Sequence, residues 1–142
     1  MLALTLTLAA LVTGPVPSVL ELNTGGGPGG PRFRATLSPQ GRLTVEKEAM
    51  PITEHGLTRS VTTVDLSPSE VVRLLGLAQR ATDFSKGCNR VADGTNALLV
   101  VSGAKAATRR KCEGAAAWPT GRATLLFLGE LNAHLDPAFR VH

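Results

Sequence analysis

The amino-acid sequence predicts an α+β fold in which an antiparallel sheet of about five to six strands carries two helices on one face. Three observations lead to this prediction. Segments with alternating apolar and polar residues precede residue 65, a helix with a complete start motif follows them, and a second strand pair leads into a leucine-rich final helix. The expected order of elements is therefore β-β-β-(β)-α-β-β-α.

The first strands are predicted from alternation and turn chemistry. Residues 19–23 alternate and predict a strand, which ends at the Gly/Pro cluster of residues 25–31. A hairpin is expected next, with strands over 32–37 and 42–46. Its connection, Ser38-Pro39-Gln40-Gly41, fits a β-turn because proline suits the second turn position and glycine the fourth. The inward faces of the hairpin are expected to carry Phe33, Ala35, Leu37, Leu43 and Val45.

The first helix has the clearest local motif in the chain. After a β-branched run at residues 60–64, which predicts a third or fourth strand, Ser67 is placed as the N-cap residue. Pro68 then occupies the first helical position and Glu70 closes a capping box. The helix is expected to continue to about Thr82. Its apolar stripe is expected to be Val71, Leu74, Leu75 and Ala78.

A second pair of strands is expected over 97–101 and 108–112, with a turn at Ser102-Gly103. The first is apolar on both faces, which is typical of a central strand. If Val101 lies near Lys105, Cys112 comes opposite about Gly94. The basic residues of the second strand fall on both faces, which favours an edge strand protected by charge against unwanted pairing; they are Arg109, Arg110 and Lys111.

The final helix is expected from about Gly121 to Leu135. Trp118-Pro119 precedes it, and Trp118 is expected to pack on the core at the helix entry. Asp136-Pro137 is expected to end the helix, because proline cannot continue it. The predicted buried stripe consists of Leu125, Leu128, Leu131 and Leu135.

Residues 1–18 are expected to be a removable signal peptide, which leaves residues 19–142 as a single α+β domain. Residues 2–12 form an apolar run of the length typical of a signal-peptide core, and a Gly/Pro segment follows it. This run is too short to cross a bilayer, so no stable membrane insertion is expected after its removal. The alternative is a first strand, since leucines alternate through the same run.

Cys88 and Cys112 are the only cysteines in the chain. In an oxidising compartment they are expected to pair and to close a loop of about 25 residues. In a cytosolic protein they would remain two thiols. The disulfide prediction therefore depends on the signal peptide. Together they predict a secreted protein in the periplasm or the extracellular space.

Composition and motifs exclude several classes of function. The net charge is +4, but neither a dense basic stripe nor stacking aromatic residues accompany it, so no nucleic-acid partner is expected. The glycine cluster contains G-x-G-x-x-G without a following helix, which disfavours nucleotide binding. The three histidines, His55, His134 and His142, are too dispersed to predict a metal site. We expect no cofactor and no enzyme activity; a hydrolase with a dispersed Ser/His/Asp site remains an alternative.

The order of elements also resembles that of the emfourin-like proteins. The resemblance spans about residues 19–135 and includes the motifs Asp65-Leu66-Ser67-Pro68, Asp93-Gly94 and Thr108-Arg109. Emfourin-like proteins are small bacterial inhibitors of thermolysin-like metalloproteases that use no cofactor. The resemblance therefore implies a bacterial protease inhibitor that acts on a protein partner, and it assigns no inhibitory residue.

The sequence thus predicts a secreted binding or inhibitor protein that uses surface loops held by the sheet. The candidate recognition loops are Gly25, Gly26, Gly27, Pro28, Gly29 and Gly30, and the hairpin turn with Pro39 and Gln40. A structural or accessory protein of the cell envelope is the alternative.

Overall fold

The computed structural model describes residues 18–26, 30–49, 58–91 and 94–141. Several predictions therefore lie outside the described residues. These are the signal peptide up to residue 17, the loop residues Gly27, Pro28 and Gly29, and the histidines His55 and His142.

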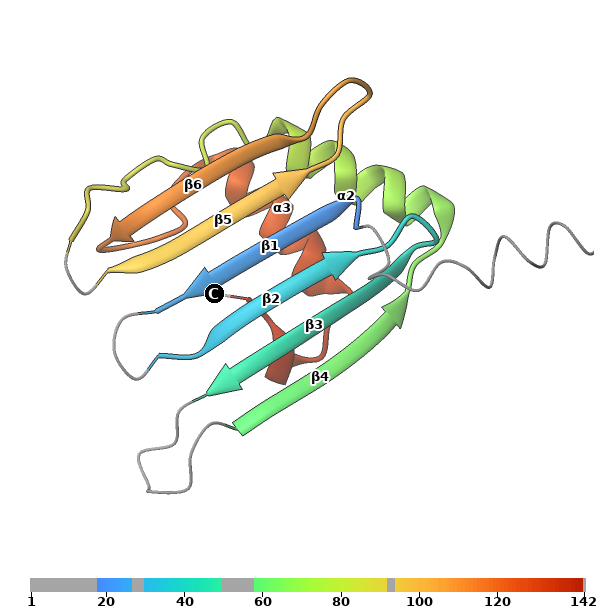
Figure 1. Ribbon diagram of the computed structural model, residues 1–142, viewed down its shortest axis with the longest axis horizontal. Helices are drawn as coiled ribbons and strands as arrows, with labels where there is room; N and C mark the ends of the chain where they lie inside the picture. Colours follow the sequence, from blue (N-terminus) through green and yellow to red (C-terminus); the bar gives the residue numbers. More distant parts are fainter. Residues whose placement is uncertain (1–17, 27–29, 50–57, 92–93, 142) are drawn as a thin grey trace, which may run out of the picture.

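Six antiparallel strands form one sheet in the order β4-β3-β2-β1-β5-β6 (Figure 1). Their bounds are β1 Leu20–Gly25, β2 Arg32–Leu37, β3 Arg42–Ala49, β4 Thr58–Asp65, β5 Thr95–Val101 and β6 Thr108–Ala115. The β-branched run at 60–64 lies within β4, which pairs with β3 along its whole length. The strand that the sequence left optional therefore belongs to the main sheet.

Two helices, α2 (Pro68–Arg80) and α3 (Arg122–Ala133), lie on the same face of the sheet (Figure 1). A short 3-10 helix, η1 (Pro137–Phe139), follows them. The predicted α+β architecture with helices on one face is confirmed. Within the described part of the chain, neither helix has the length and apolar character needed to cross a membrane.

Helix α2 begins with the capping box that the sequence predicts. The Glu70 backbone N–H donates to the Ser67 hydroxyl over 3.3 Å, and the Ser67 N–H donates to the Glu70 carboxylate over 2.9 Å. Hydrogen bonding of the Glu70 carboxylate to the Ser67 N–H, and to a smaller extent to the Ser67 hydroxyl, holds the pKa of Glu70 below its ordinary value. The helix buries Leu74 and Ala78 fully, in agreement with the predicted stripe.

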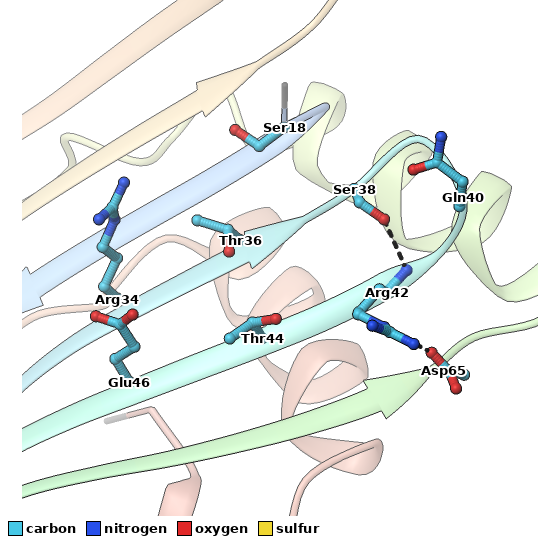
Figure 2. A pocket seen from close by; sticks show the side chains of 9 residues that line it. All are labelled: Ser18, Arg34, Thr36, Ser38, Gln40, Arg42, Thr44, Glu46 and Asp65. Carbon is cyan, nitrogen blue, oxygen red and sulfur yellow. Dashed lines mark hydrogen bonds and ion pairs between the residues drawn. The ribbon is translucent and has the colours of Figure 1, made fainter. Parts of the chain in front are cut away.

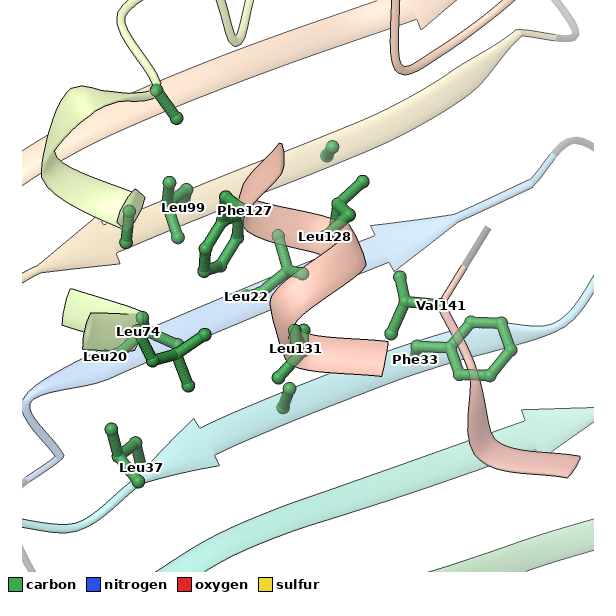
Figure 3. Close-up of a cluster of buried hydrophobic side chains, with 14 of the residues drawn as sticks. Leu20, Leu22, Phe33, Leu37, Leu74, Leu99, Phe127, Leu128, Leu131 and Val141 are labelled. Atoms are coloured by element: carbon green, nitrogen blue, oxygen red, sulfur yellow. The ribbon is translucent and has the colours of Figure 1, made fainter. Parts of the chain in front are cut away.

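The core lies between the helices and the inward side chains of the sheet (Figure 3). Alternate residues of β1, β2, β3 and β5 point into it, because successive strand residues face opposite sides. The sheet contributes Leu20, Leu22, Phe33, Ala35, Leu37, Leu43, Val45, Ala97, Leu99 and Val101. Figure 3 shows Phe127, Leu128 and Leu131 of α3 over these strands. The predicted inward residues of the hairpin are confirmed.

One residue of the predicted stripe on α3 is wrong. Leu125 is 50% exposed, whereas Thr124 and Phe127 are completely buried. The buried face therefore runs through 124, 127, 128 and 131, with the helical spacing i, i+3, i+4, i+7. The prediction considered only leucines, so it left out Thr124 and Phe127. The polar Thr124 can be buried because its hydroxyl has a hydrogen-bond partner.

That partner is Asp83, which caps α3 from a distant part of the chain. Its carboxylate accepts the Thr124 hydroxyl over 2.7 Å and the backbone N–H groups of Ala123 and Thr124 over 2.9 and 3.0 Å. The residue before the helix, Gly121, offers no side chain to cap it. A Cβ at Gly121 would lie only 2.6 Å from the Asp83 carbonyl oxygen, so glycine permits this close approach.

Trp118 packs on the core before α3, as predicted, with 8% of its surface exposed. Its indole N–H donates to the Phe84 carbonyl over 2.9 Å, and its ring meets that of Phe84 edge to face. The segment after α2 and the entry to α3 are thereby held together.

The predicted register of β5 and β6 is wrong by several residues. Val101 lies opposite Thr108 rather than Lys105, so Cys112 pairs with Ala97 rather than with about Gly94. The reason is a longer connection, residues 102–107, which shifts every pair from Val101 to Ala97 by three positions. The Cys88–Cys112 disulfide is present nevertheless, with a Cα–Cα distance of 5.4 Å.

Arg110 has a structural role that the sequence did not suggest. It lies opposite the buried Leu99, on the helix side of β6. Its guanidinium donates to the carbonyls of Ala78 and Gln79 at the end of α2, over 2.8 and 2.9 Å. A positive charge at a helix C-terminus satisfies free carbonyls and complements the helix dipole. Arg110 therefore joins the edge strand to α2.

Candidate functional site

The candidate site is the face of the sheet opposite the helices, called here the open face. Its side chains come from the strand positions between the core residues, and they include Glu21, Arg34, Thr36, Thr44 and Glu46. Two adjoining hollows of about 650 and 600 Å³ lie over it. Volumes of this size suit a bound ligand or several side chains of a partner.

The first hollow lies over β2 and β3 near the hairpin turn (Figure 2). Every residue that lines it is polar or charged: Ser18, Arg34, Thr36, Ser38, Gln40, Arg42, Thr44, Glu46 and Asp65. The second hollow lies over the opposite end of the sheet, where its lining includes Gly25, Gly26, Arg32, Glu48 and Arg59. Because Arg34 and Glu46 line both hollows, the two adjoin along the open face, and together they are called the depression here.

The hairpin turn stands at one end of this depression. It is closed by the Gly41 N–H, which donates to the Ser38 carbonyl over 3.0 Å. The Ser38 hydroxyl accepts the Arg42 N–H over 3.0 Å (Figure 2). Gly41 has a φ of +91°, and a Cβ there would lie 2.7 Å from the Leu66 carbonyl oxygen. The turn is therefore held in one conformation, with Gln40 at the edge of the first hollow.

The glycine-rich connection stands at the other end. Gly25 ends β1 and, with Gly26, lines the second hollow. The Gly26 N–H donates to the Pro31 carbonyl over 3.5 Å. Gly30 is partly buried, and the remaining three predicted loop residues lie outside the described ranges. The two predicted recognition loops thus lie at opposite ends of the same open face.

Ion pairs order the long side chains of the open face. Arg34 lies 2.9 Å from Glu21, and Arg42 lies 3.3 Å from Asp65. A third pair joins Arg59 to Glu46 over 2.9 Å. Exposed pairs of this kind contribute only about 0–1 kcal/mol each to stability. They place charges of both signs side by side along the open face.

Sequence reasoning missed most of the residues that line the hollows. The loops were found from glycine and proline, but Arg34, Thr36, Arg42, Thr44 and Glu46 come from regular strands. A signal for them exists in the same alternation that predicts the core. The outward positions of the hairpin strands are all polar or charged, and the hairpin pairing places them side by side.

His134 lies on the helix side and lines neither hollow. Its Nδ1 is 3.3 Å from a carboxylate oxygen of Glu70 on α2, and its Nε2 is 3.7 Å from one of Glu130 on α3. Glu130 also lies 3.0 Å from Arg73. With 14% of its side chain exposed, His134 belongs to a polar contact between the two helices rather than to a cleft.

No protein-family model and no curated protein matches this chain. The emfourin-like resemblance therefore remains a prediction from the order of elements and the short motifs quoted above.

Proposed function

We propose that this chain is a secreted binding protein of the inhibitor type, which recognises a protein partner with its open face and the two loops at the ends of that face. The observation that carries the proposal is the depression of two adjoining hollows between the hairpin turn and the glycine-rich connection. The residues shared by both hollows, Arg34 and Glu46, stand at its centre.

The rigidity of the open face supports this proposal. The strands beneath it are anchored by fully buried side chains on their other side, and hydrogen bonds close the hairpin turn. A surface that is already ordered loses little conformational entropy when it binds, which raises affinity. Inhibitors that present a rigid surface use this effect.

The lining chemistry favours a polypeptide partner. Pockets for small molecules are mostly apolar with a few polar groups, whereas the first hollow is lined by charged, hydroxyl and amide side chains. Both charge signs alternate there, so the matching surface would carry both as well. Within this class of partner, the emfourin-like resemblance suggests a thermolysin-like metalloprotease.

An oxidising compartment is supported by the disulfide, because such bonds persist mainly in secreted and periplasmic proteins. Together with the predicted signal peptide, it favours action outside the cytoplasm. Intact-mass measurement of the exported protein would report both cleavage near Ser18 and the disulfide.

The decisive experiment is titration of a thermolysin-like metalloprotease with the purified protein, with hydrolysis of a peptide substrate as the readout. We expect inhibition, and we expect Arg34→Glu to weaken it because this change reverses a charge shared by both hollows. Arg140→Glu is the matched control, since Arg140 is exposed beyond η1 and lines neither hollow. Absence of inhibition at micromolar concentration would rule out the metalloprotease as target, and retention in the cell-wall fraction would favour the envelope alternative.

A further inference from the structure

The two edges of the sheet are built differently. At the β6 edge, the chain around residues 90–91 runs alongside the strand. Arg90 and Val91 donate their N–H groups to the Glu113 and Gly114 carbonyls over 3.1 and 2.6 Å. The disulfide joins Cys88 to the same strand. This covering, together with the exposed Arg109 and Lys111, blocks the β6 edge against further strands.

Within the described part of the chain, the β4 edge has neither a covering segment nor a disulfide. All eight residues of β4 pair with β3 in one uninterrupted register, without a bulge or proline. No described strand lies on its other side. The strand is rich in β-branched residues, and Val61 is 52% exposed. A long, regular edge of this kind is a template for another strand.

We propose that β4 pairs antiparallel with β4 of a second copy of this chain, with the two-fold axis at Thr62. In this register Arg59 lies opposite Asp65 of the second copy, and Asp65 lies opposite Arg59 of that copy. The sequence permits this because both residues are three positions from Thr62. Both also lie on the open face, since they alternate with the inward-facing Val64.

The charges already present at this edge favour the pairing. Asp65 is held by Arg42 over 3.3 Å, and Arg59 is held by Glu46 over 2.9 Å. When two copies pair, Asp65 of each copy comes next to Arg59 of the other. The ion pairs then form two rows of alternating charge, one on each side of the two-fold axis, and each row crosses the interface. Directly opposed charges of unlike sign stabilise antiparallel strands, and like charges destabilise them.

The opposite face of the strand fits the same register. There Thr62 meets Thr62 of the second copy, and Ser60 meets Val64. Thr–Thr pairs are favourable in antiparallel sheets, and the small Ser60 leaves room for the Val64 side chain. The surface is thus self-complementary on both faces, as a two-fold interface requires.

The pairing would merge two six-stranded sheets into one and place both open faces on the same side. Two recognition surfaces would then act on one partner or on two neighbouring partners. This consequence rests on the proposed function, whereas the pairing itself does not. An association measured without any partner therefore tests the pairing alone.

The test is sedimentation velocity of the purified protein and of two charge-reversal variants, Arg59→Asp and Asp65→Arg. The wild type is expected to form a dimer in a concentration-dependent way. Each variant alone opposes two like-charge pairs, so its self-association should weaken about 30-fold. A one-to-one mixture of the variants restores opposite charges at both pairs, and we expect it to dimerise like the wild type. Arg109→Asp on β6 is the control and should leave the dimer unchanged.

A second measurement does not depend on the charge variants folding. Thr62→Cys should form a disulfide-linked dimer readily under mild oxidation, because the two positions coincide at the axis. Val64→Cys should not, since its copies lie on opposite sides of the axis. A wild type that stays monomeric at high micromolar concentration, a mixture that fails to restore the dimer, or equal cross-linking at both positions would overturn the proposal.

Discussion

Replacement of Asp83 by alanine tests a contact between two parts of the chain that are distant in sequence. The carboxylate accepts three hydrogen bonds from the first turn of α3, at residues 40 and 41 positions later in the sequence: two from backbone N–H groups and one from the Thr124 hydroxyl. Because Gly121 provides no cap, Asp83 alone supplies a side chain for this helix end among the described contacts. Asp83→Ala should therefore destabilise the whole domain.

The size of the effect follows from two terms. Loss of an N-cap side chain costs about 1 kcal/mol. Thr124 is completely buried, and a buried hydroxyl left without a partner costs about 1–3 kcal/mol. We expect the free energy of unfolding to fall by about 2–4 kcal/mol, which lowers the melting temperature of a domain of this size by about 10 °C.

The assay is urea unfolding followed by circular dichroism, at neutral and acidic pH, for the wild type and for Asp83→Asn. Partial burial alone would raise the pKa of Asp83, but the hydrogen bonds from the Thr124 hydroxyl and from the N–H groups of Ala123 and Thr124 together hold it below its ordinary value of 3.8. A lowered pKa means that the carboxylate stabilises the fold above that ordinary value and loses this effect as the pH falls further. The stability difference between wild type and Asp83→Asn should therefore shrink below about pH 4.

Asp136→Ala is the matched control. Asp136 is the residue directly before the short helix η1, but its side chain makes no capping hydrogen bond. Its replacement should change stability by no more than about 0.5 kcal/mol. Equal effects of the two alanine variants would show that the distant cap contributes no stability. A difference for Asp83→Asn that does not vary with pH would show that the charge of the Asp83 carboxylate contributes none.

Three further predictions concern other parts of the fold. Arg110→Ala should lower the free energy of unfolding by about 1–3 kcal/mol, because the Ala78 and Gln79 carbonyls at the end of α2 lose their hydrogen bonds from the guanidinium; Arg110→Lys should recover only part of this in the same urea assay. Cys88→Ser should cost about 3–4 kcal/mol, and reduction of the wild type should reproduce that loss; a smaller change on reduction would contradict it. Leu128→Ala should cost about 2–4 kcal/mol and Leu125→Ala less than about 0.5 kcal/mol, since only Leu128 is buried; equal losses would show that the assigned buried face is wrong.

Local interactions explain why so much of the fold was predictable from the sequence. The capping box at Ser67 and the turn at Pro39 are complete within four residues, so their chemistry can be read without a structure. Alternation and helical spacing then assign the faces of β1, β2, β3 and α2. The part of the open face formed by β2 and β3 was predictable in the same way, because the residues that alternate with their core positions are polar or charged.

Only the tertiary structure decided the contacts between residues distant in sequence. Asp83 caps α3 and Arg110 caps the C-terminal end of α2. Thr124 enters the core because its hydroxyl donates a hydrogen bond to Asp83. The register of β5 and β6 likewise depends on the length of a connection that carries no periodic pattern, which is why Cys112 was placed opposite the wrong residue. The hollows form from strands whose outward residues meet only after pairing. Local sequence therefore determined the elements and the buried sides of β1, β2, β3 and α2. Packing between elements decided the polar partners, the register, the full buried face of α3 and the shape of the open face.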